Sequence, residues 1–121
     1  MNQQEVLTLF KRWNLALQSG NAKTVSKLYA NNAIFLPTLS NKVRCNRSEY
    51  EAYFMDFLTR SPQAALAESN IRIFSDTVIH SGIYDFTFKD SSQVKARFTF
   101  VYYKQNTDWL IVEHHSSFMP E

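Results

Sequence analysis

The spacing of the large apolar residues changes near the middle of the chain, and this change restricts the fold more than any other feature. In the first half, apolar side chains recur every three or four residues, as on one face of an amphipathic helix. In the second half, large apolar residues alternate with polar ones, as in strands with one buried face. Helices followed by a run of strands predict an α+β domain, with the helices packed on one face of a mostly antiparallel sheet.

The first half is predicted to contain three helices, one short strand and a loop. These are helices over Gln3–Gln18 and Ala22–Tyr29, a strand over Ala33–Leu36, a loop over Thr38–Cys45, and a helix that begins after Asn46 and ends before Ser61. Asn2 and Glu5 have the spacing of a capping box, and Gly20 stands where a left-handed residue would end the first helix.

The second half is predicted to form an antiparallel meander. Its strands are a short one around Ile71 and Ile73 and three long ones over Asp76–Lys89, Val94–Lys104 and Trp109–Phe118. Because side chains alternate across a strand, the bulky even-numbered residues of the first two long strands should face the helices. These residues are Tyr84, Phe86, Phe88, Phe98, Phe100 and Tyr102.

The register of the last strand depends on the length of the loop near residues 105–108. We expect a three-residue loop that pairs Lys104 with Asp108. It would place Arg97 opposite His115, Thr99 opposite Glu113, and Phe98 opposite His114. The helix side would then hold Phe98, Phe100, Leu110, Val112, His114 and Ser116, and the far face would hold Arg97, Thr99, Glu113 and His115. A two- or four-residue loop would exchange these faces.

Composition and charge exclude several classes of protein. The 121 residues are expected to form one domain, and a hydrophobic content of 45% excludes a disordered chain. The net charge of +2 comes from scattered basic residues, which argues against nucleic-acid binding. One cysteine excludes an intramolecular disulfide, and no metal-ligand spacing or cofactor motif is present. Without a membrane-length apolar stretch or a secretory signal, a cytoplasmic location is expected.

The most plausible chemistry centres on His114. At the mouth of an apolar cavity its pKa could lie near neutrality, so that it would act as a general acid or base. Tyr50, Tyr84 and Ser116 could hydrogen-bond to it or to a ligand, and Arg44 lies in a loop that could close over the cavity. The alternative is a histidine at the edge of the core that bonds to a tyrosine and catalyses nothing.

The charged residues of the far face allow two interpretations. Arg97, Glu113 and Asp85 could form a charged site, or they could form a salt-bridged surface, with Thr99 and His115, that packs against a second subunit. We favour the interface.

Two blocks of sequence resemble the bacterial relatives of the calcium/calmodulin-dependent protein kinase II association (hub) domain. The first block includes Trp13-Asn14, Ser19-Gly20-Asn21, Leu28-Tyr29-Ala30, Leu36 to Asn41, and Arg44; the second includes Ala96 to Tyr102, Trp109 to Ser117, and Pro120. This resemblance implies the cone-shaped α+β fold of nuclear transport factor 2 and SnoaL-like polyketide cyclases, with three N-terminal helices on a strongly curved sheet.

The resemblance also implies dimers, or rings of dimers as in the kinase hubs. No kinase segment is present in the sequence, so no kinase activity is expected. The cavity positions that hold buried arginines in kinase hubs correspond here to Tyr84, Phe100 and Ser116, and a cavity histidine corresponds to Tyr50. We therefore expect a non-catalytic, self-associating domain with a small-molecule cavity. The alternatives are an enzyme of the SnoaL or ketosteroid-isomerase kind that uses His114 on an apolar cyclic substrate, and a ligand sensor.

Overall fold

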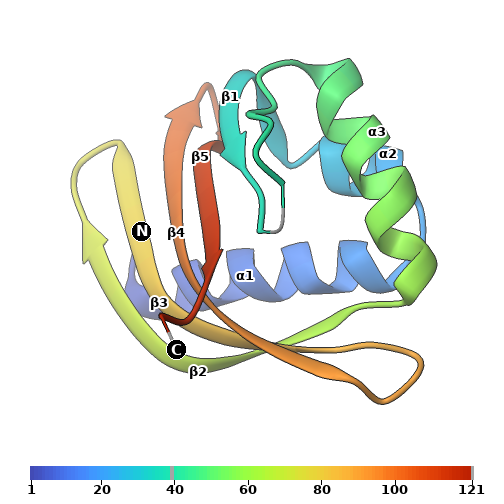
Figure 1. Ribbon diagram of the computed structural model, residues 1–121. Coiled ribbons are helices and arrows are strands. Elements are labelled where there is room, and N and C mark those ends of the chain that lie inside the picture. The colour runs from blue at the N-terminus through green and yellow to red at the C-terminus, as the bar shows by residue number, and fades with distance from the viewer. Residues whose placement is uncertain (39, 121) are drawn as a thin grey trace.

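A computed structural model describes residues 1–38 and 40–120 as an α+β fold, which confirms the predicted class (Figure 1). Leu39, part of the predicted loop and of the resembling segment, and Glu121 lie outside the described residues. In chain order the elements are α1 (Gln3–Gln18), α2 (Ala22–Ser26), β1 (Tyr29–Leu36), α3 (Arg47–Phe57), the 3₁₀ turn η1 (Leu58–Arg60), β2 (Gln63–Ile73), β3 (Thr77–Thr87), β4 (Gln93–Gln105) and β5 (Asp108–Phe118).

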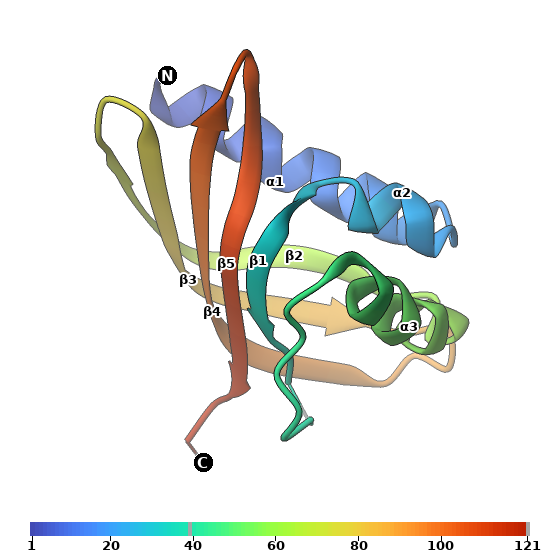
Figure 2. The ribbon, with the colours of Figure 1, turned by 90° about the horizontal axis from the view of Figure 1, so that it is seen from above.

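The five strands form one sheet in the order β1-β5-β4-β3-β2. β1 runs parallel to β5, and the other neighbours are antiparallel. The sheet is strongly curved, and the three helices lie on its concave side (Figure 2). No described helix covers the opposite, convex face of β3, β4 and β5.

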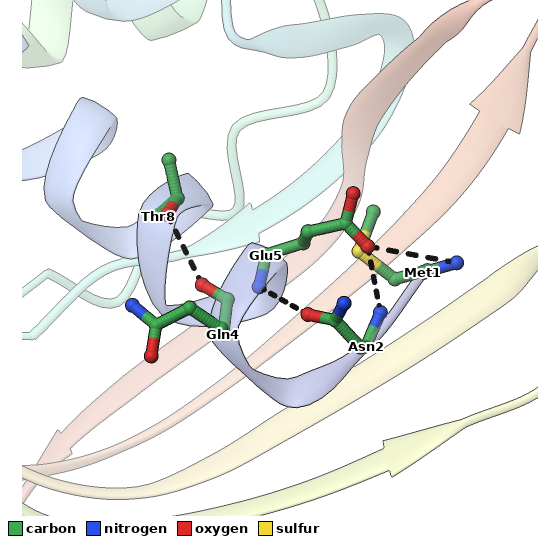
Figure 3. Close-up of polar contacts among 5 residues, drawn as sticks. All are labelled: Met1, Asn2, Gln4, Glu5 and Thr8. Atoms are coloured by element: carbon green, nitrogen blue, oxygen red, sulfur yellow. Dashed lines mark hydrogen bonds and ion pairs between the residues drawn. The ribbon is translucent and has the colours of Figure 1, made fainter.

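The first helix begins and ends as its sequence predicts. The Asn2 side chain accepts a hydrogen bond from the Glu5 amide, and the Glu5 carboxylate accepts one from the Asn2 amide, both at 2.9 Å (Figure 3). This reciprocal pair is a capping box, which satisfies two amides that the helix leaves free. At the other end, Gly20 has a φ of +72°, a conformation that strains other residues. The buried face of α1 consists of Val6, Leu9, Phe10, Trp13, Ala16 and Leu17.

Two strands are longer than predicted. Tyr29 begins β1 rather than ending α2, because its backbone pairs with β5 at Ile111. β2 begins at Gln63, since an alanine-rich segment without visible alternation pairs with the end of β3. In both places tertiary pairing decides the structure where local propensity is weak.

The even-numbered residues of β3 and β4 do face the helices, as predicted. Tyr84, Phe86, Phe88, Phe98, Phe100 and Tyr102 are all buried in the core.

The predicted register of β5 is wrong. The loop has two residues, Asn106 and Thr107, so Gln105 pairs with Asp108. A bulge at Val112 then adds one residue to β5 between the pairs Tyr102–Ile111 and Val101–Glu113. Beyond the bulge, the pairs are Phe100–His114, Thr99–His115, Phe98–Ser116 and Arg97–Ser117, two residues away from those predicted.

The faces of His114, His115 and Ser116 are nevertheless as predicted, because the short loop and the bulge together restore the alternation. Residues between the loop and the bulge show the error. Ile111 is buried in the core, whereas Leu110 and Val112, predicted on the helix side, are only half-buried.

Candidate functional site

A cavity of about 250 Å³ lies between the helices and the concave face of the sheet. Its wall is largely aromatic, with side chains from α1, β1, α3 and β3, among them Trp13, Phe35, Tyr53, Phe57, Phe86 and Phe88. A wall of this kind favours a flat, apolar molecule.

A chain of hydrogen bonds begins deep in the core and leads to this cavity. The indole nitrogen of Trp13 lies 3.1 Å from the Tyr29 hydroxyl, to which it donates. The same hydroxyl lies 2.8 Å from Nδ1 of His114. Tyr29 is fully buried, and burial raises the pKa of its hydroxyl well above the ordinary value. The hydroxyl therefore stays protonated.

The chain continues from the other ring nitrogen of His114. Nε2 lies 3.2 Å from the Tyr84 hydroxyl, which donates to Oγ of Ser116 at 2.6 Å. Ser116 Oγ in turn lies 2.5 Å from Oγ1 of Thr38. The chain thus ends at Ser116 and Thr38, which line the cavity together with His114 and Tyr84.

His114 is a neutral imidazole held between aromatic rings. Its ring stacks on Phe100 with centroids 4.0 Å apart and on Phe35 at 4.9 Å. Burial lowers the pKa of His114 to about 3, and His115 adds a smaller lowering. The expectation of a pKa near neutrality is therefore wrong, because the ring lies deep in the core and not at a solvated cavity mouth.

The structure brings together three of the five residues predicted to bind a ligand. Tyr84, His114 and Ser116 share the cavity wall. Tyr50 is not among the lining residues, since its hydroxyl donates to the Ala33 carbonyl. Arg44 also lies outside the cavity, where its guanidinium donates to a backbone carbonyl and lies 5.5 Å from the Tyr53 ring centroid.

Sequence reasoning missed Trp13, Tyr29 and Thr38 as parts of this site. The sequence pattern predicts Tyr29 at the end of a helix and Thr38 in a loop, and Trp13 belongs to the first of the two resembling blocks. No spacing in the sequence links them to His114, because they come from three separate segments. The only signal in the sequence was the chemistry of Trp13 and Tyr29, because an indole N–H or a tyrosine hydroxyl usually needs a hydrogen-bond partner when it is buried.

The mouth of the cavity carries charges of both signs. Arg60 lies over the ring of Phe88, with its guanidinium carbon 3.9 Å from the centroid. Asp56 lines the same opening one helical turn earlier. The opening therefore presents no single sign of charge to an entering molecule.

The five residues predicted for an interface all lie on the convex face. Thr99 pairs with His115, while Arg97 and Glu113 occupy the same face two positions further along their strands. Asp85 forms its ion pair with Lys95 at 2.9 Å, and Arg97 forms none within the described part of the chain. The expected salt bridges of Arg97 with Asp85 and Glu113 are therefore absent from the described residues.

An apolar strip lies beside these polar residues. Ile79 pairs with Val101, and Tyr103 pairs with Leu110, so the four side chains share the convex face of β3, β4 and β5. Tyr103 is 41% exposed, although it lies on β4, the middle strand of the sheet.

Other kinds of site receive little support. Among the described residues, no three His, Cys, Asp or Glu side chains gather as metal ligands would. None of the described helices is both long and apolar enough to cross a membrane.

Comparisons with known proteins identify the relatives of this chain. A family model described as calcium/calmodulin dependent protein kinase II association domain matches residues 2–120. A search of curated proteins finds no match. Among solved structures, a Xanthomonas campestris protein assigned to the same association domain is 44% identical, with a TM-score of 0.96. The match covers 100% of this chain and 90% of that one.

More distant structures share the fold. A nuclear transport factor 2-like protein of unknown function from Pseudomonas putida is 18% identical, with a TM-score of 0.83 over 95% of this chain and 84% of that one. A nuclear transport factor 2-like superfamily protein from Salmonella enterica is 17% identical, with a TM-score of 0.81 over 98% of this chain and 91% of that one. These similarities confirm the predicted cone-shaped fold.

Proposed function

The chain belongs to the calcium/calmodulin-dependent protein kinase II association-domain family, and on this basis we propose that it is a self-associating, non-catalytic domain with a small-molecule cavity. The observation that carries the proposal is the uncovered convex face of the sheet, where an apolar strip lies beside polar residues. The family description, an association domain, supports the same function.

A second copy of the chain is the partner that best fits this face. Ile79, Val101 and Leu110 would form the apolar centre of a contact, and Arg97 and His115 would belong to its polar rim. In a two-fold dimer the same surface meets itself, so one face supplies both halves of the contact. Asp85 and Glu113 would offer acidic partners to the basic residues of the other copy.

The cavity supports the binding part of the proposal. Its volume of about 250 Å³ exceeds the roughly 150 Å³ of an engineered apolar cavity that holds benzene. A substituted aromatic ring would therefore fit. A cytoplasmic location also belongs to the proposal, and the exposed thiol of Cys45 fits a reducing compartment.

An enzyme remains the second candidate, because His114, Tyr84 and Ser116 meet at an apolar cavity. Two observations weigh against His114 as a general base. Both of its ring nitrogens already have tyrosine partners, and its pKa of about 3 makes it a weak base at neutral pH.

Exchange of the α-hydrogens of 1-indanone in heavy water would test this alternative. Acceleration by the protein that His114→Gln abolishes would support an enzyme of the ketosteroid-isomerase kind. No acceleration is expected if the domain only binds.

Self-association is tested by measuring the mass of the protein in solution. We expect sedimentation velocity to give at least twice the chain mass of 14.1 kDa. Val101→Glu would place a charge in the apolar strip and should shift the protein toward the single chain. Arg97→Ala should also lower the mass, since it removes a charge from the boundary between subunits.

A matched control keeps this test specific. Leu15→Glu introduces the same side chain on α1, which lies on the concave side of the sheet, at a residue that is 59% exposed. It should leave the mass unchanged. A wild-type protein that sediments as a single chain at all concentrations would refute the association role.

A further inference from the structure

The hydrogen-bond chain around His114 has a direction, which its two fixed donors determine. The indole N–H of Trp13 can only donate, so the Tyr29 hydroxyl must accept from it. The single proton of this fully buried hydroxyl then has one acceptor among the described residues, Nδ1 of His114. A proton on Nδ1 would leave the Tyr29 hydroxyl without an acceptor, at a cost that buried polar groups rarely bear.

The hydrogen bonds on the other side of His114 lead independently to the same position for the imidazole proton. The geometry makes the Tyr84 hydroxyl the donor to Ser116. Its proton is therefore not free for Nε2 of His114, and Nε2 must carry a hydrogen that Tyr84 accepts. Both arguments place the imidazole proton on Nε2, and all the hydrogen bonds run from Trp13 toward the cavity.

This direction determines what the cavity offers to a ligand. Ser116 accepts from Tyr84, and its own proton or that of Thr38 joins the two hydroxyls. Whichever of them donates, the other keeps one hydroxyl proton, and no further acceptor for it lies within the described part of the chain. Both hydroxyls line the cavity, so this proton can point into it.

We propose that the end of the cavity at Ser116 and Thr38 donates a hydrogen bond, and that its ligand is an uncharged aromatic compound with an acceptor oxygen, such as an aryl ketone or aldehyde. The proposal rests on the cavity being a binding site, as proposed above, and adds the chemical class of the ligand.

The charges around the cavity explain why the ligand is uncharged. The end of the cavity at Ser116 and Thr38 supplies only hydroxyl donors and a neutral imidazole, which do not compensate the loss of water around an anion. Arg60 at the mouth stands beside Asp56, so a carboxylate gains little net attraction there. A carbonyl oxygen needs one donor, which this end of the cavity provides.

Binding of three small compounds of similar size distinguishes the contributions of shape, hydrogen bonding and charge. Acetophenone carries a carbonyl acceptor, isopropylbenzene has the same shape without one, and benzoate replaces the carbonyl group by an anion. Quenching of Trp13 fluorescence reports binding, because its ring lines the cavity. We expect acetophenone to bind about fivefold more tightly than isopropylbenzene, the effect of one net hydrogen bond, and benzoate to bind most weakly.

Substitutions locate the donor. The double variant of Thr38→Val and Ser116→Ala should reduce the fivefold preference, since it removes both hydroxyls and keeps the apolar shape. Only the Tyr84 hydroxyl, which then loses its acceptor Ser116, is left to donate. Thr59→Val, which removes an exposed hydroxyl outside the cavity wall, should keep the fivefold preference. Equal binding of acetophenone and isopropylbenzene by the wild type would overturn the donor assignment and leave the cavity function intact. Failure of all three compounds to bind would overturn both.

The tautomer of His114 tests the direction of the chain without any ligand. Long-range ¹H–¹⁵N spectra of the histidine rings, assigned with His80→Gln and His115→Gln, should show the His114 proton on Nε2 at pH 7. A proton on Nδ1 would reverse the direction of the hydrogen bonds, turn the end of the cavity at Ser116 and Thr38 into an acceptor, and overturn the proposal.

Discussion

At the scale of single residues, His114 joins the aromatic core to the polar end of the cavity. Its ring packs face to face with Phe100 and Phe35, while its nitrogens bond to Tyr29 and Tyr84. Such a residue is fixed by packing and by hydrogen bonds at once. It positions the Tyr84 hydroxyl, and through it Ser116, at the cavity wall.

Truncation of Phe100 should reveal how much the stacking contributes. Phe100 is fully buried between His114 and Trp13, whose ring centroid lies 5.1 Å away. We expect Phe100→Ala to lower the free energy of unfolding by about 3–5 kcal/mol, the usual loss for a buried phenylalanine. Urea denaturation measures this. Phe74→Ala, at a residue 54% exposed, should change it by less than about 0.5 kcal/mol. Equal effects of the two substitutions would contradict the assignment of Phe100 to the core.

The predicted faces of His114 and Ser116 are correct although the predicted loop length is wrong, because the bulge at Val112 offsets the shorter loop. What surrounds these two residues was not predicted. The partners Tyr29 and Thr38 come from segments far away in sequence, and their approach depends on how β1 pairs with β5. The depth of His114, and hence its low pKa, follows from the same pairing. Periodicity contains no information about either.

At the scale of the elements, the bulges decide where side chains point. The β4–β5 hairpin could not be predicted from Gln105 to Asp108, because this sequence is compatible with several loop lengths. The left-handed residue Asn106 permits a two-residue turn, and the bulge at Val112 compensates for it. The helices were easier to predict because caps and apolar stripes are local signals.

A second bulge, in β2, requires a glycine on the neighbouring strand. A Cβ at Gly82 would lie 2.0 Å from the carbonyl oxygen of Glu68, which is backbone and cannot rotate away. We expect Gly82→Ala to destabilise the protein by about 3 kcal/mol, because β2 and β3 must separate locally.

Gly20→Ala is a useful comparison, because its destabilisation would come from backbone strain and not from a steric clash. No atom lies within 4 Å of the Cβ position at Gly20, but its φ of +72° strains an alanine. The expected loss there is about 1 kcal/mol. Thermal unfolding of both variants measures the difference. A Gly82→Ala protein as stable as the Gly20→Ala protein would mean that the bulge in β2 is absent or easily displaced.

At the scale of the whole molecule, the curved sheet separates the cavity from the face proposed for association. Its concave side holds the cavity under the helices, and its convex side is available for association (Figure 2). The sequence predicts this division, since the buried aromatic residues of β3 and β4 lie at even positions. It does not predict the volume of the cavity, which depends on how far α3 stands from the sheet.

Two buried histidines should make the stability of the whole fold depend on pH. Burial lowers the pKa of His80 to about 4 and is the main cause of the lowering at His114 to about 3. An unfolded chain binds protons at these histidines below a pH of about 6.5. The folded protein does not, so protonation favours unfolding. The stabilisation is fully present above about pH 6.5 and decreases as the pH falls toward the folded pKa values.

Between pH 6 and pH 5 the free energy of unfolding should therefore fall by about 1 kcal/mol for each histidine, or about 2 kcal/mol for both. Urea denaturation at several pH values and one protein concentration measures this slope. His80→Gln should halve it, because only His114 then contributes. Asp90 and Glu49 also have lowered pKa values, but carboxylates titrate mainly below pH 5 and do not produce this slope. A free energy of unfolding that is constant between pH 6 and pH 5 would show that His80 and His114 are protonated as easily in the folded protein as in the unfolded chain. In that case His114 would not be desolvated in the core, as its position in the hydrogen-bond chain requires.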